Sequence, residues 1–196
     1  MSGDVQVRFC ERPGVKLPWA THLVVLCRDE AEAQRVLDTI RQWVEQVGLT
    51  LHPTKTRLVN LNQVGEGFDF LGYHFERGRR GKCWRGPRTK SEKNFREEVR
   101  EHTRRTNGDS LEKIIEKLNP KLRGFFEYFK QSYAAALVRL DKWVRMRLRS
   151  ILRKRHHGRG RGHGSDHWRW PNAFFGAHGL FSMAGARAKL VQSSPR

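Results

Sequence analysis

The chain reads Leu23-Val24-Val25-Leu26-Cys27 near its start, a short apolar run that is typical of a strand buried on both faces. Residues 29–47 then repeat apolar side chains at helical spacing, and Gly48 fits the left-handed position just past a helix end. Residues 49–51 begin another predicted strand. A helix packed on a sheet is therefore predicted, with this stripe facing the sheet: Ala33, Val36, Leu37, Ile40, Val44 and Val47.

A further strand is predicted at residues 68–75, which read Phe-Asp-Phe-Leu-Gly-Tyr-His-Phe. Aromatic residues alternate there with others, as they do in a strand that has one covered face. In such a strand Phe70 and Tyr73 would lie on opposite faces, so that both cannot belong to the core. Gly72 would permit the close approach of another backbone.

The second part of the chain reads as helical. Residues 77–82 are rich in glycine and arginine and predict a hairpin turn, and residues 87–91 form the predicted linker. Three segments with helical periodicity follow, at residues 92–105, 110–129 and 134–155. Within the second, Asn119-Pro120 offers a cap and a first-turn proline, which predicts a new or kinked helix. The aromatic residues after it repeat at the spacing of a buried face and are assigned to the core: Phe125, Phe126 and Phe129.

Several of these motifs resemble those of group II intron reverse transcriptases, the intron-encoded proteins also called maturases. The matching segments occur in the order of that family and span most of the chain: Leu23–Arg28, Leu-Thr-Leu-His-Pro-Thr-Lys-Thr at 49–56, residues 68–75, and Leu-Asn-Pro-Lys-Leu-Arg-Gly-Phe-Phe-Glu-Tyr-Phe at 118–129. The resemblance implies an α+β fold. A partial reverse-transcriptase palm, of antiparallel strands plus one helix, would be followed by an α-helical thumb bundle, the X or maturase-specific domain.

The resemblance divides the chain into four regions. Residues 1–18 stay unassigned, and their prolines and glycine suggest irregular chain. Residues 19–86 would form a palm remnant with a primer-grip-like strand, and residues 91–155 the helical thumb, which the resemblance implies binds intron RNA. Residues 156–196 would form a basic tail rich in glycine, arginine, histidine and aromatic residues, predicted to be flexible at 156–164 until it meets RNA.

The resemblance also shows which residues are missing. In that family the first strand is entered through Tyr-Ala-Asp-Asp, whose aspartates hold the Mg²⁺ ions of nucleotidyl transfer, but here the positions read Trp19-Ala20-Thr21-His22. A hydroxyl and a neutral imidazole are poor replacements for two carboxylates at a magnesium site. We therefore predict no catalytic residue, no metal site, no cofactor bound by this chain, and no polymerase activity from the chain alone. Mg²⁺ would be expected only in an intact member of the family.

Charge is distributed unevenly along the chain. The formal net charge is +19, yet residues 1–75 hold 8 Lys and Arg against 9 Asp and Glu, whereas residues 76–196 hold 31 against 11. Such an excess on a folded segment is the electrostatic footprint of polyanion binding, most often of nucleic acid. The predicted partner is a structured RNA, in particular a group II intron RNA.

Candidate nucleic-acid contacts follow from the charge and the resemblance. Lys55 lies in the turn that in the family is near the incoming nucleotide, with a structural hairpin lysine as the alternative. Tyr73 belongs to the primer-grip-like strand. Trp168 and Trp170 could stack on unpaired bases or dock on the helical bundle, and both interpretations stay open. Basic residues of the last long helix and the tail would meet phosphates: Arg139, Lys142, Arg145, Arg149, Arg153, Arg155, Arg159 and Arg161.

Composition excludes several classes of protein. No apolar run approaches the roughly 20 residues that a membrane span requires, and the start lacks the apolar centre of a signal peptide, so we expect a soluble cytoplasmic protein. The three cysteines are widely spaced and form neither a disulfide framework nor a zinc knuckle.

Three hypotheses for function remain at this level. The favoured one is a shortened maturase that binds intron RNA and assists its folding and splicing without catalysis. The second is the downstream half of a split RNA-directed DNA polymerase, which would need a second chain carrying the fingers and the first half of the palm. The third is a decayed remnant with no selected function.

Overall fold

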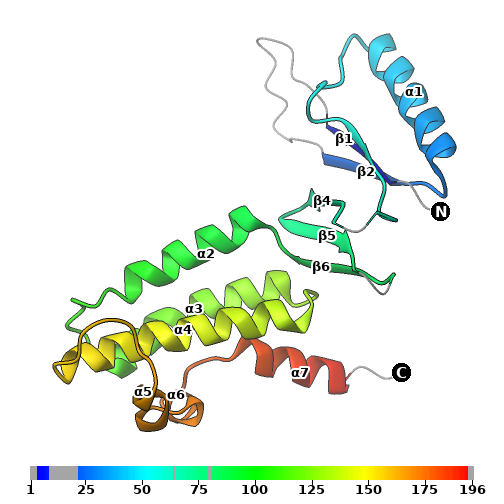
Figure 1. The fold of residues 1–196 in the computed structure, drawn as a ribbon. Helices are drawn as coiled ribbons and strands as arrows, with labels where there is room; N and C mark the ends of the chain where they lie inside the picture. The colour runs from blue at the N-terminus through cyan, green and yellow to red at the C-terminus, as the bar shows by residue number, and fades with distance from the viewer. Residues whose placement is uncertain (1–3, 9–21, 64, 79–80, 194–196) are drawn as a thin grey trace. The chain divides into compact units, whose positions relative to one another are not determined.

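The computed structural model describes residues 4–8, 22–63, 65–78 and 81–193. The chain forms two compact units, residues 1–85 and 86–196, each with its own fold. The first combines strands with one long helix and the second is helical (Figure 1). The predicted α+β class, a partial palm followed by a helical domain, is confirmed.

A three-stranded antiparallel sheet opens the first unit. It contains β1 (Asp4–Arg8), β2 (His22–Leu26) and β3 (Arg57–Val59), in the order β2-β1-β3. The central strand therefore comes from the segment that the sequence left unassigned, and the expectation of irregular chain is wrong for residues 4–8. The expected strand at residues 49–51 is also wrong, because Leu51 forms only an isolated bridge and the strand lies after the turn, as β3.

Helix α1 (Glu30–Gln46) follows β2 as predicted. Its start is fixed by Asp29, whose carboxylate accepts a 2.8 Å hydrogen bond from the amide of Glu32. Gly48 takes a φ of 71° just past the helix end. The predicted apolar stripe packs against the strand, except for Val47, which is exposed at the cap: Ala33 and Leu37 are buried with Cys27, and Val36 and Ile40 are partly buried beside them.

The second sheet contains β4 (Gly67–Phe70), β5 (Tyr73–Arg77) and β6 (Cys83–Pro87). The single strand expected at residues 68–75 is wrong, because Leu71 and Gly72 both take positive φ and form a tight turn between β4 and β5. Phe70 and Tyr73 are thus cross-strand partners on one face rather than residues on opposite faces. The predicted hairpin turn between β5 and β6 is confirmed, since the amide of Gly78 donates to the carbonyl of Lys82 at 3.0 Å.

Three long helices form the frame of the second unit: α2 (Thr89–His102), α3 (Leu111–Phe129) and α4 (Ala134–Arg155). Strand β6 ends two residues before α2 begins, so the predicted linker at residues 87–91 is wrong. Helix α3 runs through Pro120 without a break, so the alternative of a new helix starting there is wrong. Phe126 and Phe129 are buried and Phe125 packs beside them, so their assignment to the core is confirmed.

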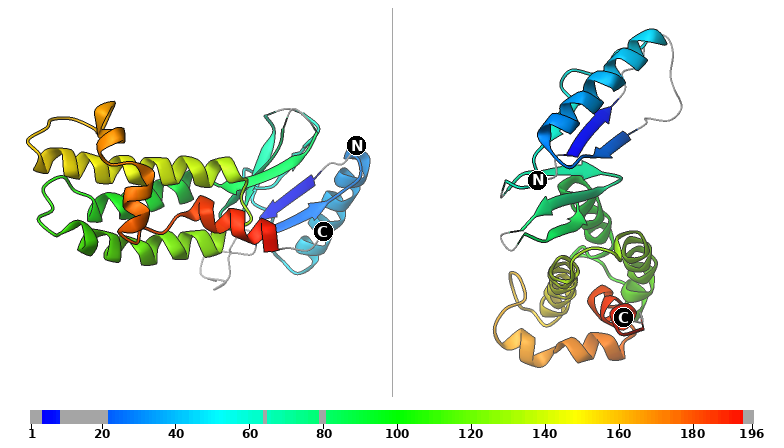
Figure 2. Two further views of the ribbon diagram at one scale, coloured as in Figure 1. Left: turned by 90° about the horizontal axis from the view of Figure 1, so that it is seen from below. Right: turned by 90° about the vertical axis from the view of Figure 1, so that its right-hand side faces the viewer.

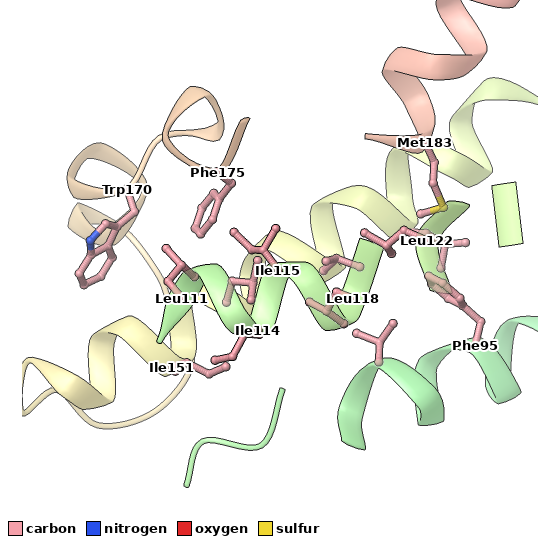
Figure 3. Packing of buried hydrophobic residues seen from close by; sticks show 14 of the residues in the cluster. Phe95, Leu111, Ile114, Ile115, Leu118, Leu122, Ile151, Trp170, Phe175 and Met183 are labelled. Carbon is pink, nitrogen blue, oxygen red and sulfur yellow. The ribbon is translucent and has the colours of Figure 1, made fainter. Parts of the chain in front are cut away.

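The C-terminal residues belong to this unit and do not form a separate tail. Helices α5 (Ser165–Arg169), α6 (Asn172–Ala177) and α7 (Met183–Ser193) follow α4 (Figure 2). Trp170, Phe175 and Met183 are buried in the same core cluster as Leu111 and Leu118 of α3 (Figure 3). A family-like thumb ending at residue 155 would leave this core open, because its last apolar residues come from beyond α4.

Two polar side chains of the long helices hold the C-terminal segment in place. Asp141 of α4 is 3% exposed, and its carboxylate accepts hydrogen bonds from the amides of Met183 and Ala184 at 3.2 and 3.0 Å. It thereby binds the first amides of α7, which have no partner inside that helix. Asn119 of α3 donates to the carbonyl of Gly179 and accepts from the amide of Phe181, both at 2.9 Å.

No helix in the described part of the chain combines the length and the apolar character that crossing a bilayer requires.

Candidate nucleic-acid interface

Four arginines surround a concave pocket on the second unit. The pocket has a volume of about 340 Å³, and we call it the arginine pocket. Its arginines are Arg100, Arg105, Arg147 and Arg161, from the end of α2, the loop after it, α4 and the loop before α5. The remaining lining residues are Trp143, Met146, Ser150 and Gly160.

Arg147 is fixed in this pocket by the end of α2. Its Nε donates to the hydroxyl of Thr103 at 3.1 Å, and one terminal nitrogen donates to the carbonyl of Thr103 at 2.6 Å. Thr103 is itself fully buried at the C-cap of α2. A guanidinium held by a buried residue loses little conformational entropy when it binds a ligand.

The ring of Trp143 holds one of the pocket arginines and a neighbouring arginine of α2. The guanidinium of Arg96 lies 4.7 Å from the centre of its ring, and that of Arg100, one helical turn on, lies 5.6 Å from it. Arg96 is also paired with Glu92 at 2.8 Å, which fixes it against the ring. For Arg100 no carboxylate among the described residues lies within ion-pair distance, so its charge is left to the pocket.

The loop after α4 is held against that helix and positions Arg161. The amide of Gly158 donates to the carbonyl of Arg153 at 2.8 Å, and the amide of Gly162 donates to the hydroxyl of Ser150 at 3.2 Å. A Cβ at position 162 would lie 2.7 Å from Cβ of Arg149, so the close approach requires glycine. The segment expected to be flexible is thus, in the structure, bonded to α4 at both ends.

The arginines of the pocket repel one another. Burial lowers the pKa of the Arg147 guanidinium, and the positive charges of the other three arginines lower it further. Among the residues that the structure describes, no carboxylate lies within ion-pair distance of any of the four. A bound anion would relieve this repulsion, so the pocket suits phosphate.

Three of the sequence-predicted contacts have structural roles. Arg149 is 2% exposed and donates to the carbonyl of Trp170 and the side chain of Asn172, both at 2.9 Å. Its pKa is lowered by burial and by the charge of Arg145, an effect that Asp166 partly offsets. Arg153 pairs with Asp166 at 2.7 Å, and Trp170 is 6% exposed. Burial argues against direct RNA contact by Arg149 and Trp170. Of the two interpretations for Trp170, docking on the helical bundle is the one that the structure favours.

Asp166 is the anion that organises this buried network. Burial alone would raise its pKa, but the backbone amide of His163 and the guanidinium of Arg153 outweigh that effect and hold the pKa below its ordinary value. The carboxylate is therefore ionised near neutral pH and available to Arg153.

The other predicted contacts of α4 and the following segment differ in how far they are exposed and paired within the protein. Arg139 is paired with Glu92 at 2.5 Å but remains more than half exposed, and Arg145 is mostly buried, 3.9 Å from Asp141. Arg155 donates to the carbonyl of Asp109 in the loop before α3. Arg155 is exposed as well, and so are Lys142, Arg159, Arg161 and Trp168, the last of them 88% exposed.

The predicted contacts of the first unit belong to different elements of its fold. Lys55 is exposed in the turn before β3, and Tyr73 is half-buried at the start of β5, with its ring 6.1 Å from that of Phe75. Thr21 lies outside the described residues, and for His22 only the backbone at the start of β2 is described. The replacement of the family's aspartates by Thr21 and His22 is therefore known from the sequence alone.

Sequence reasoning missed three of the four arginines of the pocket. Arg161 was a predicted contact, but Arg147 was not, and neither were Arg100 and Arg105. The local signal for them is the cluster of basic residues at the end of α2, where Arg100, Arg104 and Arg105 follow one another closely. That signal shows that positive charge is concentrated at the end of α2. It does not show that these arginines converge with Arg147 and Arg161, because α2 and α4 meet only in the tertiary structure.

Comparison with known families covers all four arginines of the pocket. Residues 92–170 match the sequence model of the family described as group II intron, maturase-specific domain. The matched residues run from the start of α2 to the buried Trp170. No curated protein matches the chain.

Proposed function

We propose that the chain, whose residues 92–170 match the model of the group II intron maturase-specific domain family, is an RNA-binding maturase-like protein that assists the folding and splicing of a group II intron RNA. It would do so without polymerase activity of its own. In this proposal the RNA meets the arginine pocket and the exposed cations around it. The cytoplasmic location expected from the sequence stays a prediction.

The observation that carries the proposal is the convergence of four arginines with no carboxylate from the described part of the chain within ion-pair distance. Solubility alone does not require guanidinium groups to cluster around one pocket, and their mutual repulsion destabilises the folded state. RNA phosphates would offset that repulsion and release counterions on binding. The guanidinium fork also matches phosphate oxygens geometrically.

Exposed cations outside the pocket would extend the contact. Lys142 and Lys154 of α4 and Arg159 in the following loop are exposed and have no carboxylate within ion-pair distance in the described part of the chain. Folding of a structured RNA needs phosphate neutralisation and contacts to exposed loops, which surface chemistry of this kind supplies. The proposed role in RNA folding thus requires no catalytic group on the protein.

The lack of polymerase activity rests on the sequence. Thr21 and His22 stand where the family has its metal-binding aspartates, and neither side chain favours Mg²⁺ as a carboxylate does. The split-polymerase alternative is supported by the first unit, where Leu26 is 74% exposed on strand β2, at the edge of its sheet. Primer extension by a mixture of this chain and a chain carrying fingers and first palm half would test that alternative.

The test of RNA binding is a titration with the RNA that flanks the gene and with an unrelated structured RNA, at about 50 and 200 mM salt. Both RNAs should lose roughly 10³ to 10⁵ in affinity over this range if 6 to 10 phosphates are contacted. Preference for the flanking RNA at the higher salt supports the proposal. Equal affinity for both RNAs there would reduce the chain to a generic basic protein.

A pair of charge variants separates the exposed surface from the buried network. Lys142→Glu with Arg159→Glu should lower the affinity and reduce the steepness of the salt dependence, because each contacted phosphate contributes about 0.7 to 0.9 to that slope. The matched control is Arg35→Glu with Arg41→Glu on α1 of the first unit, which should leave the affinity within about twofold.

A further inference from the structure

We propose that the arginine pocket receives a single unpaired nucleotide of the RNA, held by the phosphates on both of its sides, and does not bind a paired stem. This rests on the proposed function, because it names the RNA feature that the same site recognises.

The first argument is shape. The pocket's volume of about 340 Å³ lies at the low end of the range of about 300 to 1,000 Å³ that small-molecule sites occupy. A hollow of this size takes one nucleotide. An A-form stem is convex and presents its phosphates across a wide shallow groove, so its backbone cannot enter such a hollow.

The second argument is charge. Arg100, Arg105, Arg147 and Arg161 bring four positive charges to one nucleotide-sized space, and no carboxylate of the described residues offsets them. One phosphodiester supplies a single negative charge, whereas a nucleotide turned into the pocket brings the phosphates on both of its sides. The repulsion that lowers the pKa of the Arg147 guanidinium is consistent with a site built for more than one anion.

The third argument is the planar surface beside the charges. Trp143 lines the pocket, and the guanidinium of Arg100 lies over its ring, so that an arginine plane backed by an aromatic ring is at hand for a base. Unpaired bases are commonly recognised by stacking on aromatic side chains or on guanidinium planes. Paired bases in a stem expose no such face. The site thus joins phosphate recognition to stacking.

The experiment uses the full chain and three RNA hairpins with one stem sequence: fully paired, with a one-nucleotide bulge, and with the same bulge made abasic. Stacking of one base is worth about 1 to 3 kcal/mol, so the bulged hairpin should bind about 5- to 150-fold more tightly than the paired one. The abasic bulge keeps both phosphates but lacks the base, so it should bind less tightly than the intact bulge and more tightly than the paired hairpin. Equal affinity of the bulged and paired hairpins for the wild-type chain would overturn the proposal.

Protein variants separate the pocket from general phosphate attraction. Arg100→Lys with Arg161→Lys keeps the charge but removes the guanidinium planes, so the preference for the bulge should fall at least fivefold while affinity for the paired hairpin stays within about twofold. The control Arg104→Lys changes the exposed neighbour of Arg105 and should keep the preference. An equal loss for both hairpins in the double variant would assign the pocket to sequence-independent phosphate contact.

Failure of this inference and failure of the proposed function are distinguishable. If the bulge confers no advantage but the flanking RNA is still preferred at about 200 mM salt, the maturase-like function stands and its RNA contact lies elsewhere on the basic surface. If the bulge is preferred in any RNA but the flanking RNA is not, the pocket is a nucleotide site in a protein with another RNA target.

Discussion

Replacing Asp141 by alanine should loosen the whole C-terminal segment from the helical unit. The carboxylate accepts hydrogen bonds from the amides of Met183 and Ala184 and, at 2.8 Å, from the hydroxyl of Ser182. Hydrogen bonds to a charged group contribute about 1.5 to 3 kcal/mol each, although the three here share one carboxylate and do not add fully. The amide of Met183 would be left buried without a partner. We therefore expect a loss of about 3 kcal/mol in the free energy of unfolding.

The assay is thermal unfolding of the full chain, followed by far-ultraviolet circular dichroism. A loss of this size corresponds to a fall of about 14 °C in Tm for a unit of about 100 residues. The control is Glu127→Ala, which removes an exposed carboxylate paired with Lys130 at 3.1 Å on α3 and should change Tm by no more than about 2 °C. Limited proteolysis should cut Asp141→Ala between α6 and α7 before it cuts the wild type.

A fall of less than about 3 °C for Asp141→Ala would refute the reasoning. It would mean that α7 is held by apolar contacts alone, such as the burial of Met183, and that the buried carboxylate is satisfied as well by water as by the helix. The C-terminal segment would then be a separable attachment, as the sequence first suggested.

Three further outcomes are expected. The pKa of Asp166 is lower in the folded state than in the unfolded chain, so its stabilising contribution is present above about pH 4 and is lost as the pH falls through the folded value; Asp166→Asn should make acid unfolding less steep in a pH titration. Trp170→Ala should cost about 3 to 5 kcal/mol of stability in chemical denaturation, whereas Trp168→Ala, at an exposed position, should cost less than about 0.5 kcal/mol. Gly162→Ala should lower the affinity for RNA and have only a minor effect on Tm. The Cβ of the alanine would lie 2.7 Å from that of Arg149 and push the loop that carries part of the arginine pocket. An unchanged affinity would contradict this.

The elements predicted well are those in which periodicity and caps agree. Helix α1 combines an apolar stripe with Asp29 at its start and Gly48 at its end, and α4, predicted at residues 134–155, runs from Ala134 to Arg155. Local sequence determines such helices because the hydrogen bonds and caps are local, and the buried face follows from the spacing.

The elements predicted poorly depend on partners distant in the chain. Strand β1 has an alternating pattern, Asp-Val-Gln-Val-Arg, which could have indicated a strand, but only pairing with β2 and β3 makes it the centre of a sheet. The turn at Leu71-Gly72 carries only one glycine, so the aromatic alternation on both sides was taken for a single strand. In each case the pairing, and not the local propensity, decided the structure.

The sequence by itself determined the charge of the second unit, its helices and the resemblance to maturases, because composition, periodicity and motifs are local properties of the chain. Only the tertiary structure decided which cations can meet a ligand. Arg147 and Arg149 are two residues apart on one helix, yet one lines the arginine pocket while the other is buried beneath Trp170. The same holds for Trp168 and Trp170, one exposed and one in the core. Neighbouring positions on a helix face different directions, and which direction is covered is set by segments that return from elsewhere in the chain.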